Sequence, residues 1–220
     1  MLRFILAALV CLCVQFSVFA QTTPFVGALG GLATLSADAR SLPSPQGLNV
    51  SLYKPENGPA LNLLAGLHLH RYLSLQANYV WNKNALTLSS NSSTSNSFYE
   101  QHRKSSQHAI LFDLLVYFRP TNHRLRPYLS VGTGLLHFSS TRQNEVALGG
   151  GPVLPPVHFA STRPALRVAV GIDVALTPRL ALRYTFSETI RHNDIGAQLV
   201  PRGQRNLANF QNLFGFVIRF

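Results

Sequence analysis

The stretch that decides the fold runs Leu166-Arg-Val-Ala-Val-Gly-Ile-Asp-Val-Ala-Leu-Thr-Pro-Arg-Leu-Ala-Leu-Arg-Tyr-Thr-Phe186. Apolar residues occupy every second position up to Leu176 and again from Leu180 onward. Alternation with period two predicts β-strands that carry one apolar and one polar face. Leu176 and Leu180 share the apolar face only if they pair across a turn centred on Pro178. The stretch therefore predicts an antiparallel hairpin.

The same alternation recurs along the chain. The other segments are Leu61–His70, Leu73–Trp81, Ile110–Phe118, Leu129–Leu135 and Phe210–Phe220. A weaker segment rich in glycine and alanine, Thr23–Leu35, brings the number of predicted strands to eight, but its sequence does not fix which residues share a face. Each segment is close to the roughly 9–11 residues that a tilted strand needs to cross a bilayer. An even number of strands places both termini of the chain on the same side of the membrane.

The polarity of the two faces indicates which way they point. A soluble barrel or sandwich, the alternative fold, would turn the apolar faces inward and cover its surface with charged residues. Here that surface would consist mainly of glycine, serine, asparagine and histidine, with almost no lysine. Rows of leucine and phenylalanine suit lipid instead. The sequence therefore predicts an all-β fold, an eight-stranded antiparallel up-and-down transmembrane β-barrel over residues 21–220.

Aromatic residues near the strand ends support this orientation. They are expected to form a girdle at each membrane interface. The expected members are Tyr79, Trp81, Phe138 and Phe186 on the loop side and Phe118 and Phe220 on the turn side.

Residues 1–20 resemble a secretory signal peptide. Arg3 supplies a positive charge, the apolar run Phe4–Val14 follows, and Ser17–Ala20 holds small and apolar residues. This order of features is typical of export signals, and the run is too short for a membrane-spanning helix. Cleavage after Ala20 would remove both cysteines of the chain. We expect transport through the periplasm to the bacterial outer membrane.

Composition narrows the function classes. The chain holds 19 Lys+Arg and 8 Asp+Glu, a net charge of +11, which falls to +10 when Arg3 leaves with the signal. The basic residues are scattered, only 12% of residues are charged and 46% are hydrophobic. This distribution argues against a nucleic-acid partner. A basic surface favours anionic lipopolysaccharide instead.

The connections between predicted strands alternate in length. Short links are expected at 70–72, 119–126 and 177–179, and long polar ones at 36–59, 83–106, 139–163 and 189–208. The second long link contains the low-complexity stretch Ser89–Ser97, and the third contains Gly149–Pro156. Short periplasmic turns and long extracellular loops are the arrangement expected of outer-membrane barrels. Four long loops are therefore expected outside the cell.

Three stretches resemble the eight-stranded outer-membrane barrel family of OmpA-like and opacity-type β-barrel domains. They are Arg126–Leu135, Val170–Tyr184 and Phe214–Phe220. The last is similar to the C-terminal signal that the barrel-assembly machinery reads, with Phe220 as its final residue. The resemblance implies that the barrel-assembly machinery and periplasmic chaperones are partners, and a monomer is expected. The chain ends at Phe220, so no peptidoglycan-binding domain is expected after the barrel.

Asp173 and Arg183 are the best-supported pair of interior residues. Counting three residues back from Leu176 and three forward from Leu180 puts them opposite each other on the inward face. Opposite charges at directly opposed positions of a sheet stabilise the pairing. We expect an ion pair that fills the lumen, although a gate or a proton path remains an alternative reading.

The sequence gives weaker support for catalytic or metal-binding residues than for the interior ion pair. His137-Phe-Ser139 resembles the His-x-Ser of outer-membrane lipid A deacylases, but it departs in position, and its acid candidate, Glu145, falls in a predicted loop. His68 and His70 share a predicted face but lack a third metal ligand. Sequons at Asn49–Ser51 and Asn91–Ser93 are chance matches in a bacterial protein. We expect no catalytic, cofactor-binding or metal-binding residue.

The sequence thus favours a non-enzymatic barrel with a structural or surface-interaction role through its loops. A narrow passive channel is the first alternative, and a lipid A-modifying hydrolase is the second. An eight-stranded barrel leaves little open lumen, which disfavours a general pore.

Overall fold

The computed structural model describes residues 22–37, 52–92, 97–148, 157–192 and 206–220. These residues form nine strands: β1 (Thr23–Ala37), β2 (Leu52–Pro55), β3 (Asn57–His70), β4 (Leu73–Ser92), β5 (Ser97–Tyr117), β6 (Leu125–Leu148), β7 (His158–Ala175), β8 (Leu180–His192) and β9 (Asn206–Arg219). Among the described residues, no helix is long and apolar enough to cross a membrane.

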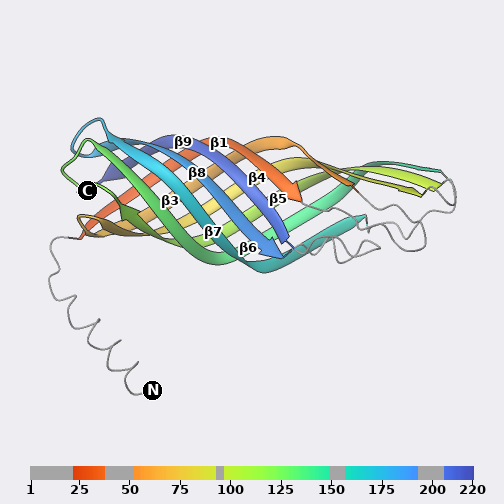
Figure 1. Ribbon diagram of the computed structural model, residues 1–220, viewed down its shortest axis with the longest axis horizontal. Helices are drawn as coiled ribbons and strands as arrows, with labels where there is room; N and C mark the ends of the chain where they lie inside the picture. Colours follow the sequence, from red (N-terminus) through yellow and green to blue (C-terminus); the bar gives the residue numbers. More distant parts are fainter. Residues whose placement is uncertain (1–21, 38–51, 93–96, 149–156, 193–205) are drawn as a thin grey trace, which may run out of the picture.

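Eight of the strands close into an antiparallel barrel (Figure 1). Each pairs with its neighbours along the chain, and β1 completes the ring by pairing with both β3 and β9. The short β2 lies outside this ring and pairs with β4 beyond the end of β3. The predicted fold class is therefore confirmed.

The hairpin of β7 and β8 has the predicted turn. The backbone N–H of Leu176 donates to the carbonyl of Leu180 at 2.9 Å. The hydroxyl oxygen of Thr177 accepts from the backbone N–H groups of Arg179 at 3.3 Å and Leu180 at 2.9 Å. These bonds satisfy the backbone of the turn and fix the register of the two strands.

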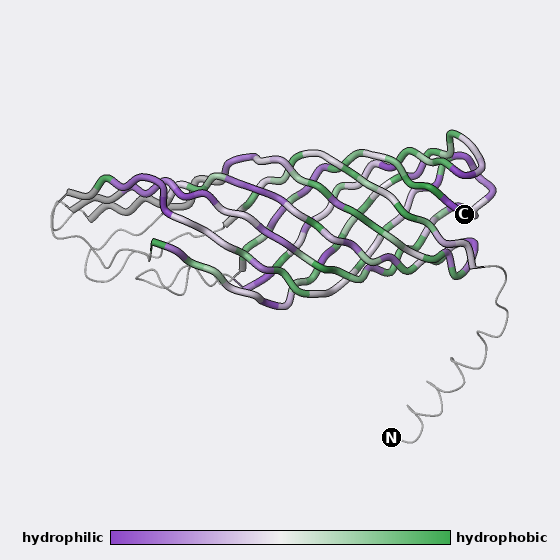
Figure 2. Tube along the Cα trace, turned by 180° about the vertical axis from the view of Figure 1, so that it is seen from behind, coloured by the Kyte–Doolittle hydropathy of each residue, from purple (hydrophilic) through white to green (hydrophobic). Residues whose placement is uncertain are grey.

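Side chains alternate between the outside and the inside along each strand of the barrel. Apolar residues predicted to face lipid are exposed, among them Phe112 at 64%, Leu135 at 57% and Phe214 at 54%. Figure 2 shows hydrophobic and hydrophilic residues alternating along the strands of the barrel wall. Because exposed apolar surface on this scale is unfavourable in water, the wall suits a hydrocarbon surround.

The strands run further into the predicted loops than the sequence indicates. β4, β5 and β6 are 20, 21 and 24 residues long, and β4 pairs with β5 from Leu73 to Ser92. Most of the predicted loop 83–106 is therefore paired strand, which corrects that expectation. The reason is that polar residues alternate as well as apolar ones, and backbone pairing does not require an apolar face. These three strands extend beyond the rest of the barrel at the end away from the C-terminus (Figure 1).

The interior is less polar than predicted. β1 turns Phe25, Leu29 and Ala33 inward, where they form an apolar cluster with residues of β3 and β9. Phe138, expected in the outer aromatic girdle, is fully buried inside and packs against Phe159 at 6.2 Å between ring centroids. The position of Phe138 along β6 suits the girdle. The alternation from Leu135, however, places His137 and not Phe138 on the outer face.

Candidate functional site

A buried polar network inside the barrel centres on Arg183. Asp173 on β7 lies directly opposite Arg183 on β8. The guanidinium donates through Nε to Asp173 Oδ1 at 2.6 Å and through Nη2 to Oδ2 at 2.8 Å. Both side chains are 1% exposed. Two charge-assisted bonds in this fork geometry hold the pair rigidly in place.

This pair is tied to the opposite wall of the barrel. Arg183 Nη1 donates to Gln76 Oε1 at 2.6 Å, and Nη2 donates to the Tyr117 hydroxyl at 2.9 Å. Tyr117 in turn donates to Asp173 Oδ2 at 3.1 Å. Gln76 belongs to β4, which lies four strands away from β8 in either direction around the ring. The hydrogen bond between Gln76 and Arg183 therefore crosses the full width of the lumen.

A second network lies nearer the projecting end. Arg167 on β7 forms an ion pair with Asp113 on β5 at 3.0 Å, and it donates to Ser187 Oγ on β8 at 3.3 Å. Further along, Asn209 on β9 donates to Gln107 on β5 at 3.3 Å, which again joins opposite strands. Side chains thus bridge the lumen at successive heights.

Two glycines make room for these networks. A Cβ added at Gly132 would lie 2.0 Å from Asp113 Oδ1, and one added at Gly171 would lie 2.4 Å from the Tyr128 hydroxyl. Gly132 and Gly171 therefore occupy inward positions directly opposite Asp113 and Tyr128. They allow the charged and aromatic side chains to fill the interior.

The end of the chain closes the barrel wall. Phe220 is 71% exposed, and its backbone N–H donates to the carbonyl of Pro24 at 3.0 Å. Phe214, Phe216 and Ile218 lie on the same outward row. This placement leaves the terminal aromatic ring accessible at the end that carries the short turns (Figure 1).

The arrangement of His137 and Ser139 does not form a catalytic triad. His137 Nδ1 is hydrogen-bonded to Thr162 Oγ1 at 2.8 Å rather than to a carboxylate. Glu145 is paired with Arg142 and lies eight residues further along β6, which corresponds to about 26 Å of strand at ~3.3 Å per residue. The acid candidate is therefore out of reach of the histidine.

The structure also separates the two histidines that were considered as metal ligands. His68 is buried and bonded to Ser74 Oγ at 2.6 Å, whereas His70 follows a break in register and is exposed. No group of three or more potential metal ligands occurs within the described ranges. The sequon at residues 49–51 lies outside the described residues, as do signal residues 1–20, and the second sequon begins on β4 and ends outside them.

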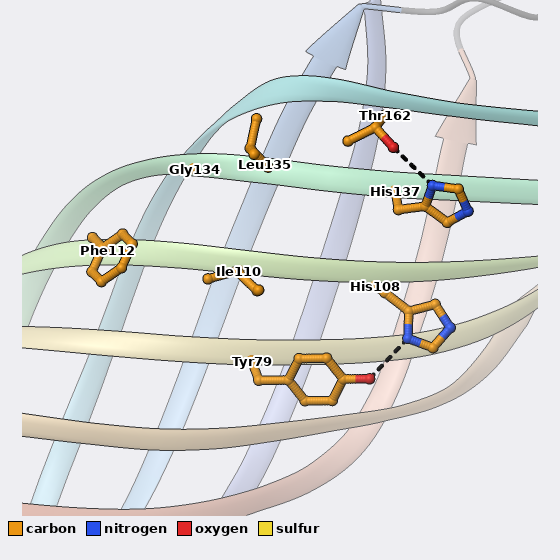
Figure 3. Close-up of a pocket in the computed structure, with 8 residues that line it drawn as sticks. All are labelled: Tyr79, His108, Ile110, Phe112, Gly134, Leu135, His137 and Thr162. Carbon is orange, nitrogen blue, oxygen red and sulfur yellow. Dashed lines mark hydrogen bonds between the residues drawn. The ribbon is translucent and has the colours of Figure 1, made fainter.

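One feature of the outer wall had no sequence signal. A pocket of about 370 Å³ lies on the outer face and spans the four neighbouring strands β4, β5, β6 and β7. Figure 3 shows the imidazoles of His108 and His137 at one end of it and Phe112 at the other. Its lining residues are far apart in the sequence, so only the strand register brings them together.

The sequence matches the Outer membrane protein beta-barrel domain over residues 4–220. The chain belongs to this family. Among solved structures it is similar to Neisserial surface protein A, with a TM-score of 0.53 and 15% identity, covering 91% of this chain and 99% of that one. It is also similar to OprG of Pseudomonas aeruginosa, with a TM-score of 0.50 and 14% identity, covering 90% and 96%. No curated protein matches it in sequence.

The family fits the geometry described above. Both solved barrels lie under 25% identity, so the likeness supports the outer-membrane barrel fold and does not carry over a ligand. The bacterial outer membrane is accordingly the membrane in which the exposed apolar wall resides.

Proposed function

We propose that the protein is a non-conducting outer-membrane barrel that acts at the cell surface through its projecting strands. The observation that carries this proposal is the change in outward residues along β5. From Val116 to Ile110 they are apolar, as is Phe118 just after the strand, whereas from His108 to His102 they are polar or basic. The part of β5 from His108 to Ser97 extends roughly 35 Å along the strand at ~3.3 Å per residue.

The length of this projection favours a surface role over a structural one alone. An anchor in the membrane needs strands that cross the apolar layer, and about ten residues suffice for that. β4, β5 and β6 are about twice that length, and their described outer parts are mainly hydrophilic (Figure 2). Short turns at the opposite end are typical of the periplasmic side, which supports an extracellular position for the projection.

The interior networks argue against the channel alternative. Gln76, Tyr117, Asp173 and Arg183 join opposite walls within hydrogen-bonding distance, so an ion would have to break a buried ion pair to pass. Removing one partner of such a pair costs about 3–5 kcal/mol. The separation of His137 from Glu145 similarly weighs against the hydrolase. We place outer-membrane lipid, lipopolysaccharide and the barrel-assembly machinery among its partners, with a monomeric barrel in the membrane.

Shortening the β4–β5 hairpin tests the surface role. Lys83 pairs with Ser106, so residues 84–105 can be replaced by an Asn-Gly turn that suits a two-residue hairpin. Cells without adhesins of their own should aggregate or attach to coated surfaces when they express the full barrel, and they should lose this attachment with the shortened one. A double variant His102→Ala/Lys104→Ala keeps the hairpin and tests its outward side chains. Attachment by the shortened barrel at the full level would contradict the proposal.

A further inference from the structure

The outer pocket lies where the barrel wall changes from apolar to polar. Outward residues of β5 are apolar up to Ile110 and polar from His108, and those of β6 change between Leu135 and His137. The stretch from Phe118 to Ile110 rises roughly 20 Å at ~3.3 Å per residue and a tilt of about 40°. This is close to the roughly 25 Å apolar band of such barrels, so the pocket lies at the upper interface of the membrane.

The two ends of the pocket differ in chemistry. Ile110, Phe112 and Leu135 form its apolar part and are continuous with the lipid-facing wall. At the other end His108 lies directly opposite His137 on the neighbouring strand. An elongated ligand with an apolar tail and a polar head matches this polarity.

Each of the two imidazoles is hydrogen-bonded through Nδ1 to a neighbouring hydroxyl group. Tyr79 OH lies 2.8 Å from His108 Nδ1, and Thr162 Oγ1 lies 2.8 Å from His137 Nδ1 (Figure 3). When these hydroxyls donate, each neutral ring carries its proton on Nε2. Because directly opposed residues place their Cβ atoms about 5 Å apart, the two Nε2–H groups can reach one anionic group.

Two positively charged side chains lie above the pocket. Lys83 and Lys104 are exposed on the outer face, two and four residue pairs beyond the pair that holds His108. The carboxylates of Glu100 and Glu145, nearer the tips of these strands, are paired with His102 and Arg142. The charge beside the polar end of the pocket is therefore complementary to an anion such as a phosphate.

We propose that this pocket binds a phosphorylated glycolipid of the outer leaflet, of the lipid A class. One acyl chain lies along Ile110, Phe112 and Leu135, and His108 and His137 donate to a phosphate that Lys83 and Lys104 also neutralise. This deepens the proposed function, since it rests on the projecting end being extracellular. It assigns the lipid contact to one defined site instead of the whole wall.

The test uses the refolded full-length mature barrel in phosphatidylcholine nanodiscs that contain hexa-acylated lipid A. Native mass spectrometry measures how much lipid A stays bound, with dephosphorylated lipid A and phosphatidylglycerol as competing probes. The wild-type barrel should retain one lipid A with at least tenfold preference over both. His108→Gln/His137→Gln should lower that preference about tenfold, and Leu135→Trp should block the apolar part.

The matched control is Leu32→Trp on β1. Leu32 is 56% exposed and Leu135 is 57% exposed, but Leu32 does not line the pocket. Leu32→Trp should bind as the wild type does, and heat-modifiable migration on detergent gels should show that all variants are folded. Equal binding by the double histidine variant and the wild type, or equal loss in both tryptophan variants, would overturn the proposal. Attachment by the shortened barrel at the full level, with lipid A still preferred by the wild-type barrel, would leave this site standing and overturn only the proposed role of the projection in attachment.

Discussion

Replacing Arg183 with methionine is expected to lower the free energy of unfolding by about 3–5 kcal/mol, because it leaves Asp173 buried without its cation. The substitution also removes the bond across the lumen to Gln76 and the bond to Tyr117. Urea-induced unfolding in lipid vesicles can follow this loss through the fluorescence of Trp81, the only tryptophan of the chain.

Two further variants separate charge from packing. Asp173→Asn/Arg183→Met removes both charges and should recover part of the loss, since no buried carboxylate remains unpaired. Arg179→Met changes the same residue type in the exposed turn and should alter stability by less than about 0.5 kcal/mol. Equal stability of Arg183→Met and Arg179→Met would show that the network does not stabilise the barrel.

Replacing Phe220 with alanine is expected to reduce the amount of protein in the outer membrane at least tenfold, with the remaining chain degraded or aggregated in the periplasm. Lipid contact of one phenylalanine is worth roughly 1.5–3 kcal/mol, which is a modest loss for a closed barrel. The backbone bond from Phe220 to Pro24 survives the substitution. The large expected effect therefore comes from the assembly signal that the C-terminal stretch resembles.

Phe214→Ala is the matched control for this prediction. Phe214 is 54% exposed on the same outward row but lies away from the terminus. It should lose lipid contact without losing assembly, and both variants should refold in detergent. If Phe220→Ala reaches the outer membrane at the level of Phe214→Ala, the assembly role is wrong. If Phe220→Ala is absent from the outer membrane and also fails to refold in detergent, Phe220 is mainly structural.

Alternation was sufficient to predict the eight strands and the direction of most side chains. The pairing of Asp173 with Arg183 could be placed because the turn at Pro178 fixes the register over only ten residues. Pairing between strands joined by a short turn can be predicted because the turn residues and the alternation on either side fix the register.

Contacts across the lumen could not be predicted in the same way. Gln76 and Arg183 are 107 residues apart and meet only because the ring closes at a particular width and stagger. The outer pocket has the same origin, since its lining residues come from four strands. The length of β4–β6 was missed because polar strand and polar loop have similar composition.

Single-channel recording in planar bilayers tests most directly whether the lumen is closed. With the network of Asp173, Arg183 and Gln76 in place, the refolded barrel should insert without conductance steps. The recording uses about 1 M salt, at which surface charges are screened beyond ~3 Å. Inserted protein is verified by its heat-modifiable migration. Regular, reproducible steps from the wild-type barrel would show that ions pass through the interior and would contradict the account.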